Sequence, residues 1–166
     1  GPIGGRRNLV INGAMNVAQR GQQTGQTGNS YTACDRFLTA EGGAAVTTSS
    51  QSTDVPSGQG FANSLEIDIT TADTDISSND FFIMIQRQNV TLTYDGYVTT
   101  AFDDDTNHSL AIQWWFAAGS NFSSGTLQSN TWQNTANNRA VGQVNCLDST
   151  SNEIYLTGVQ VEVGSV

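Results

Sequence analysis

Alternation of apolar and polar residues is most informative near the C-terminus, in a predicted strand over 154–163. Its apolar positions begin at Ile154 and Leu156 and change parity after Gly158, so that they continue from Val159. Neighbouring side chains of a strand point to opposite faces, so an uncorrected shift would turn the apolar face outward. Glycine reaches the backbone angles of a β-bulge, whose extra residue restores the phase. We therefore predict a bulge at Gly158, in a closing strand that stays half buried along its length.

Short strands with turns between them account for most of the remaining pattern. Residues 62–72 alternate strictly, which indicates a strand with one exposed face, whereas five consecutive apolar residues at 81–85 indicate a strand covered on both faces. The pair Asn12-Gly13 predicts a turn, and 14–20 fit either a helical turn or a strand. The other predicted strands are 8–11, 31–39, 45–49, 90–94, 110–116 and 139–147, and the predicted polar loops are 21–30 and 118–138.

This succession of short strands without a convincing helix predicts an all-β fold, an antiparallel β-sandwich of the jelly-roll kind. Abundant Thr, Ser, Asn and Gly agree with many turns between strands. The chain of 166 residues fits one domain, which we expect over 8–166, after an N-terminal linker or tag remnant at 1–7.

Charge and hydropathy narrow the classes of partner. The net charge is −9, and all six basic residues are arginine, so we expect no nucleic-acid binding to this surface. No apolar run reaches the roughly 18 residues of a membrane span, so we expect no membrane insertion. Cys34 and Cys146 are too far apart for a CxxC motif; a disulfide and two free buried thiols both stay open, and the free thiols are the simpler interpretation.

Two motifs near the N-terminus carry a resemblance to a known family. They are Asn-Leu-x-Ile-Asn-Gly-x-Met-x-x-Ala-Gln-Arg-Gly over 8–21 and Tyr-x-x-x-Asp-Arg-Phe over 31–37. Further similar segments lie at 60–65, 118–122, 138–145 and 157–164. Together, and in this order, they resemble a family of bacteriophage tail-fibre and related virion proteins of marine and cyanobacterial phages. The resemblance implies a structural role in the virion.

A more distant resemblance concerns the two ends of the predicted sandwich. The opening Asn-Leu-x-x-Asn-Gly and the closing Val-x-Val-Glu are similar to galactose-binding-like carbohydrate modules, whose first and last strands pack near each other. This implies that 8–11 neighbours the closing strand. Relatives in the phage family carry a longer middle near 86–92, so either the domain is abridged there or a segment is missing from the sequence. An abridged sandwich would expose sheet edges and need a partner, such as another copy in a homotrimer.

Candidate catalytic and metal-binding residues are few. The single histidine, His108, lies in a polar stretch, and no nucleophile elbow or phosphate loop occurs. We expect a non-enzymatic protein without a cofactor, although an acidic pair for glycan cleavage stays open. Asp103, Asp105 and Asn107 alternate like the start of a calcium loop, but the glycine and distal glutamate of that loop are missing, so a solvated turn is the preferred interpretation and no metal is expected.

Tryptophan and arginine supply the remaining candidates. Trp114 shares a parity with apolar residues and is expected in the core, whereas Trp115, beside Gln113, and Trp132 are candidates for stacking on glycans. Packing under a loop or in a subunit interface is the alternative for both. The structural candidates are Asn12 and Gly13, at the predicted turn, and Arg20, Asp35 and Arg36. Each arginine needs a carboxylate or carbonyl partner, so we expect these three residues to fix the N-terminal segment, and ligand binding is the less favoured alternative.

These observations lead to one expected function and two alternatives. We expect a virion protein, a fibre, spike or capsid-decoration module, which forms a homotrimer, contacts other virion proteins and adheres to host-surface glycans. The first alternative is a carbohydrate-binding module of a secreted protein. The second is a glycan-cleaving enzyme.

Overall fold

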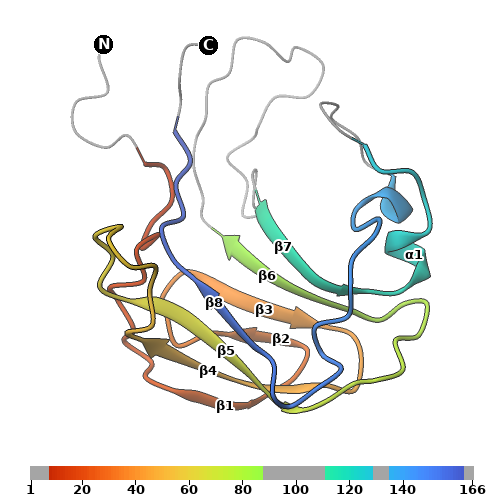
Figure 1. The fold of residues 1–166 in the computed structure, drawn as a ribbon, viewed down its shortest axis with the longest axis horizontal. Helices are drawn as coiled ribbons and strands as arrows, with labels where there is room; N and C mark the ends of the chain where they lie inside the picture. Colours follow the sequence, from red (N-terminus) through yellow and green to blue (C-terminus); the bar gives the residue numbers. More distant parts are fainter. Residues whose placement is uncertain (1–7, 88–110, 129–134, 163–166) are drawn as a thin grey trace.

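The computed structural model describes residues 8–87, 111–128 and 135–162 (Figure 1). The described chain forms two antiparallel four-stranded sheets, with strand orders β1-β4-β5-β8 and β2-β3-β6-β7. The first sheet consists of β1 (Gln23–Gln26), β4 (Val46–Ser52), β5 (Ser64–Thr71) and β8 (Glu153–Leu156). The second consists of β2 (Asn29–Tyr31), β3 (Phe37–Glu41), β6 (Phe81–Arg87) and β7 (Ala111–Ala118). The predicted all-β class is therefore confirmed.

Two short helices complete the described part: α1 (Ser120–Ser123) and the 3-10 helix η1 (Ala136–Asn138). Neither has the length or apolar character of a membrane-crossing segment, and no other helix occurs in the described ranges. Both helices follow β7 along the chain, and Ala140 N–H, just after η1, donates to Phe122 O in α1 at 2.9 Å. This helical region therefore lies over the end of the second sheet.

The core lies between the two sheets and explains the clearest sequence patterns. Leu65, Ile67 and Ile69 of β5 are fully buried on one face, as the alternation in 62–72 predicted. They join one hydrophobic cluster with Phe82 and Met84 of β6. This shared burial holds the two sheets together, since removal of apolar surface from water is the main favourable contribution to packing.

Strand β6 is covered on both faces, as its run of apolar residues predicted. Phe82 and Met84 face the core, whereas Ile83 and Ile85 belong to a second buried cluster with Leu38 of β3. The two clusters lie on opposite faces of the same sheet, since neighbouring side chains of a strand alternate. The second sheet therefore has two apolar faces.

Strand β7 places the aromatic residues that the sequence singled out. Trp114 pairs with Met84 and packs against Phe37, with ring centroids 6.4 Å apart, so its predicted core position is confirmed. The pairing register of β6 and β7 shifts between Phe82 and Ile83. The shift changes the face to which the next side chains of β7 point, and Ala117 beyond it is fully buried. Trp115 lies on the opposite face to Trp114.

Four predictions of local structure are wrong. The expected strand 8–11 is reduced to an isolated bridge at Asn8, and the chain bends and turns from Val10 onward. The expected loop 21–30 contains β1 and β2, which are recognised by their backbone pairing with β4 and β3 and need no apolar side chains. The expected strand 31–39 is interrupted between β2 and β3 by a turn in which Arg36 has a φ of 74°. The expected strand 139–147 forms turns, one of them at Gly142 with a φ of 82°.

The closing segment changes its partner where a bulge was predicted. β8 pairs with β5 and ends at Leu156, and Gly158 then has a φ of 68°. Beyond it the chain leaves β5 and pairs with the N-terminal segment: Leu9 N–H donates to Val161 O at 2.7 Å, and Asn8 forms an antiparallel bridge with Glu162 (Figure 1). The expected contact between the two ends of the chain is confirmed. The predicted bulge is not present as such: the apolar positions change parity because the chain changes its pairing partner at Gly158, and the pairing with β5 does not continue beyond it.

Several predictions fall outside the described residues. These are the linker 1–7, most of the junction 86–92, the strand 90–94, and His108, Trp132, Asp103, Asp105 and Asn107.

Candidate functional site

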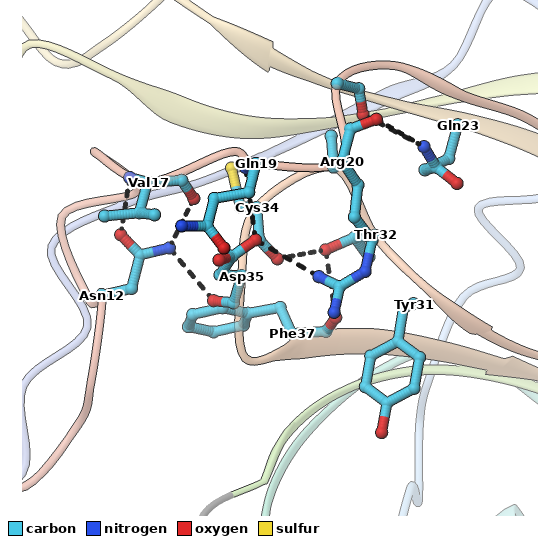
Figure 2. A network of polar contacts seen from close by, with 12 residues as sticks. Asn12, Val17, Gln19, Arg20, Gln23, Tyr31, Thr32, Cys34, Asp35 and Phe37 are labelled. Carbon is cyan, nitrogen blue, oxygen red and sulfur yellow. Dashed lines mark hydrogen bonds and ion pairs between the residues drawn. The ribbon is translucent and has the colours of Figure 1, made fainter.

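Asn12 organises the N-terminal segment at one end of the sandwich. Its backbone has a φ of 60°, a left-handed conformation that asparagine tolerates better than most residues. Its side-chain amide donates to Val17 O at 2.9 Å and to Asp35 O at 3.0 Å, and its Oδ1 accepts from Val17 N–H at 2.9 Å (Figure 2). One side chain thus ties the loop that follows it to the turn that precedes β3.

Gly13 fixes this segment to the C-terminal segment. Val159 N–H donates to Gly13 O at 2.9 Å, and a Cβ built on Gly13 would lie 2.0 Å from Val159 O. Only glycine fits this approach of two backbones. Asn8 adds a hydrogen bond from Nδ2 to Val159 O at 2.9 Å. The expected structural roles of Asn12 and Gly13 therefore have a direct physical basis.

A buried layer lies beneath this network. Met15 is fully buried, and its carbonyl accepts a hydrogen bond from Gln51 Nε2 at 2.6 Å. Cys34 is buried beside it, and burial, with a smaller contribution from the Asp35 charge, raises the pKa of its thiol to about 11. Cys34 and Cys146 are both free, so of the two interpretations left open the free thiols are confirmed.

Arg20 is held on two sides above this layer. Its Nη1 donates to Asp35 Oδ1 at 3.2 Å, and its guanidinium carbon lies 4.8 Å from the centroid of the Tyr31 ring (Figure 2). Gln19 N–H donates to the same oxygen of Asp35 at 3.3 Å. The expected carboxylate partner of Arg20 is therefore present, and the two sequence motifs meet at this ion pair.

Arg36 completes a solvent-exposed hollow. The hollow has a volume of about 310 Å³ and is lined by Arg20, Tyr31, Asp35 and Arg36. Arg36 is exposed, and its guanidinium makes no hydrogen bond or ion pair with any residue that the structure describes. The expected carboxylate or carbonyl partner is thus present for Arg20 and missing, within the described ranges, for Arg36.

A second buried network, which was not predicted, lies at the opposite end of the sandwich. Asp73 is 6% exposed, and its carboxylate accepts from Ala44 N–H at 2.9 Å and Asp75 N–H at 3.3 Å. Its backbone accepts from Asn145 Nδ2 at 2.8 Å and donates to Leu147 O at 2.8 Å. Asp73 begins an acidic stretch, 73–80, and acidic side chains are mostly exposed in proteins. Only the Asp-x-Asp spacing, typical of a local side-chain-to-backbone turn, indicates this role.

Trp115 packs against two neighbouring aromatic rings. It is half-buried on the outer face of β7, and its ring centroid lies 5.3 Å from that of Phe122 in α1 and 6.3 Å from that of Phe81. Gln113 lies on the same face and is exposed, opposite Ile85 of β6. The geometry of Trp115 therefore matches the alternative of packing under a neighbouring segment.

The described residues offer binding groups and little for catalysis. No three or more His, Cys, Asp or Glu side chains gather there in a way that could hold a metal ion. Among the described residues that line the hollow there is one carboxylate, Asp35, and it is already paired with Arg20. Hydrogen-bond donors and an aromatic surface are what this site presents to a ligand. Comparisons with protein families, with curated proteins and with solved structures find no match for the chain.

Proposed function

We propose that the chain is a non-enzymatic structural module of a bacteriophage virion, a fibre, spike or capsid-decoration domain whose sandwich is of the jelly-roll kind. One observation carries this proposal. The two motifs that resemble phage tail-fibre proteins contact each other through Asn12 and Asp35 and through Arg20 and Asp35. These contacts fix the opening segment on the sandwich. The motifs therefore serve the scaffold, which favours a shared architecture over a shared catalytic activity.

Assembly with other copies is part of the same proposal. Within the described ranges β7 lies at one edge of the second sheet and is eight residues long. Edge strands of this length are normally covered or paired, because their free N–H and C=O groups attract other strands. We propose a homotrimer that contacts other virion proteins and adheres to host-surface glycans.

Solution mass tests this function most directly. Multi-angle light scattering should give about three times the 17.6 kDa of one chain, and antibodies raised against the chain should label phage particles. A stable monomer that labels no particle would contradict the virion assignment.

A carbohydrate-binding module of a secreted protein is the second candidate. The hollow beside Arg20 and Tyr31 favours it, because an arginine against an aromatic ring is a surface suited to sugars. A monomer that binds glycans would support this candidate, whereas a trimer that labels particles would support the first.

A further inference from the structure

We infer that the hollow lined by Arg20, Tyr31, Asp35 and Arg36 binds a saccharide that carries a carboxylate group. The inference names the ligand class for the glycan adhesion proposed above. It can fail without affecting the proposed assembly.

Local charge favours an anionic ligand. The whole chain has a net charge of −9 and six basic residues, and two of those six line this hollow. Among the described lining residues Asp35 is the single carboxylate and is paired with Arg20, so Arg36 leaves one surplus positive charge among them. A long polyanion would meet repulsion from the rest of the acidic surface. A ligand with one carboxylate matches the hollow and avoids that repulsion.

The backbone at Arg36 supports a ligand-binding role for its side chain. Its φ of 74° lies in the left-handed region, where glycine or asparagine would be the relaxed choice. Strained positions of this kind cluster at active sites and ligand clamps, where the surrounding structure holds them in place. The guanidinium group suits a carboxylate, because its N–H groups match the two oxygens in one plane.

Tyr31 supplies the surface for the sugar ring. It is 59% exposed, lies at the end of β2, and its hydroxyl donates no hydrogen bond to a described residue. An aromatic ring offers an apolar face for the C–H groups of a pyranose and a polar tip for a hydroxyl. Arg20 is already oriented by Asp35 and by this ring, so binding has little side-chain entropy to remove from that residue.

The volume of the hollow sets the size of the ligand. About 310 Å³ is at the small end of ligand pockets, which span roughly 300–1,000 Å³. It accommodates a single terminal sugar, such as a uronic or sialic acid. The shared chemistry of these sugars is a carboxylate on a ring with hydroxyl groups.

Titration calorimetry with the full chain tests the inference, with methyl glucuronide and N-acetylneuraminic acid as probes and methyl glucoside as the neutral comparison. At least one acidic sugar should bind about tenfold or more tightly than the glucoside, since a hydrogen bond to a charged group has this effect on affinity. Binding should weaken as salt is added. Equal affinity for acidic and neutral sugars, or no heat from any of them at millimolar concentration, would overturn the inference.

Two matched variants locate the site. Arg36→Gln should lower affinity about tenfold, whereas Arg139→Gln, which makes the same charge change at an exposed position outside the hollow, should leave it unchanged. Arg36→Gly removes the guanidinium while suiting the positive φ, so it should fold normally and still lose binding. Equal losses in the Arg36 and Arg139 variants would show a general charge effect and refute the site.

Two further measurements separate the possible failures. A glutamate-containing peptide that binds as tightly as the sugars would refute the saccharide class. Light scattering on the same samples distinguishes failure of the ligand from failure of the proposed function: a trimer that binds no acidic sugar contradicts only the inference, and a monomer that binds it contradicts only the assembly.

Discussion

Each end of the sandwich contains a carboxylate that ties segments together, but the two carboxylates have different surroundings. Asp73 lies beyond the end of β5, is buried, and is bound by backbone N–H groups from Ala44 and Asp75. Asp35 lies at the opposite end, is partly exposed, and binds Arg20 beside Arg36, which has no ion-pair partner among the described residues. One end therefore uses its charge wholly for structure, and the other leaves charged groups accessible to ligands. The comparison predicts where substitutions should affect stability and where they should affect binding.

The largest loss of stability is expected for substitution of Gly158, because at the Asp35 end the fold depends on close packing of the backbone and not on charged side chains. A Cβ at Gly158 would lie 2.6 Å from the Phe61 ring, and its φ is 68°. Gly158→Val should lower the free energy of unfolding by about 4 kcal/mol, from strain and overpacking together. Gly142→Val is the matched control, since Gly142 has a φ of 82° and no atom within 4 Å of such a Cβ. Equal losses in denaturant titrations of the two variants would show that Phe61 does not matter.

Removal of the buried carboxylate should have the next largest effect. Asp73→Ala leaves the N–H groups of Ala44 and Asp75 without their acceptor, so we expect a loss of about 3 kcal/mol in the free energy of unfolding. Asp75→Ala removes an exposed carboxylate two residues away and should change the free energy by less than about 0.5 kcal/mol. Similar losses for both would remove the distinction drawn between the two ends.

Removal of the exposed ion pair should have a small effect. Arg20→Gln breaks the contact with Asp35, but this pair is exposed to solvent, with 41% of the Arg20 side chain accessible. We expect a loss of less than about 1 kcal/mol, decreasing further in high salt. Urea titrations at low and high ionic strength measure it. A loss as large as that of Asp73→Ala would mean that both ends are structural.

The two thiols, one at each end, have the smallest effect at neutral pH, because their contribution to stability changes only in alkaline solution. Burial raises the pKa of both Cys34 and Cys146 from 9.0 to about 11. In the unfolded chain they ionise at lower pH, so unfolding becomes easier once the pH passes the unfolded value. The contribution of the two thiols to the free energy of unfolding should be constant below about pH 9 and should fall between about pH 9 and 11. A Cys34→Ala, Cys146→Ala variant should lack this component; an identical pH profile would contradict it.

Sequence analysis succeeded where side chains define the structure. Strands β5 and β6 were predicted because burial on one face or on both faces leaves a direct pattern in apolar residues such as Ile67 and Ile83. β1 and β2 were missed because their side chains are mostly polar and leave no apolar pattern, although Gln26 is buried, and backbone hydrogen bonds define both strands. Periodicity therefore identifies strands with an apolar face, including the edge strands β7 and β8, and misses strands made of polar residues.

The candidate site was predictable only in part, for a similar reason. A carboxylate or carbonyl partner for Arg20 was predicted because the chain has few basic residues, and Asp35 is that partner. The exposed hollow was not, because it depends on a turn in which Arg36 adopts a positive φ that the residue type does not indicate. The network of Asp73 was hidden for the opposite reason, since an aspartate in an acidic stretch usually lies in solvent.

The pairing of Asn8 with Glu162 also determines how the module would respond to mechanical load. Tension applied through these two residues pulls across an antiparallel pair, so its few hydrogen bonds open one after another and do not share the load. The segments on either side of Gly13 and Val159 would peel first, while the ladders of β4, β5 and β6 lie beyond the pulling points. In a fibre, such a seam would yield and re-form as an extensible element before either sheet is disrupted.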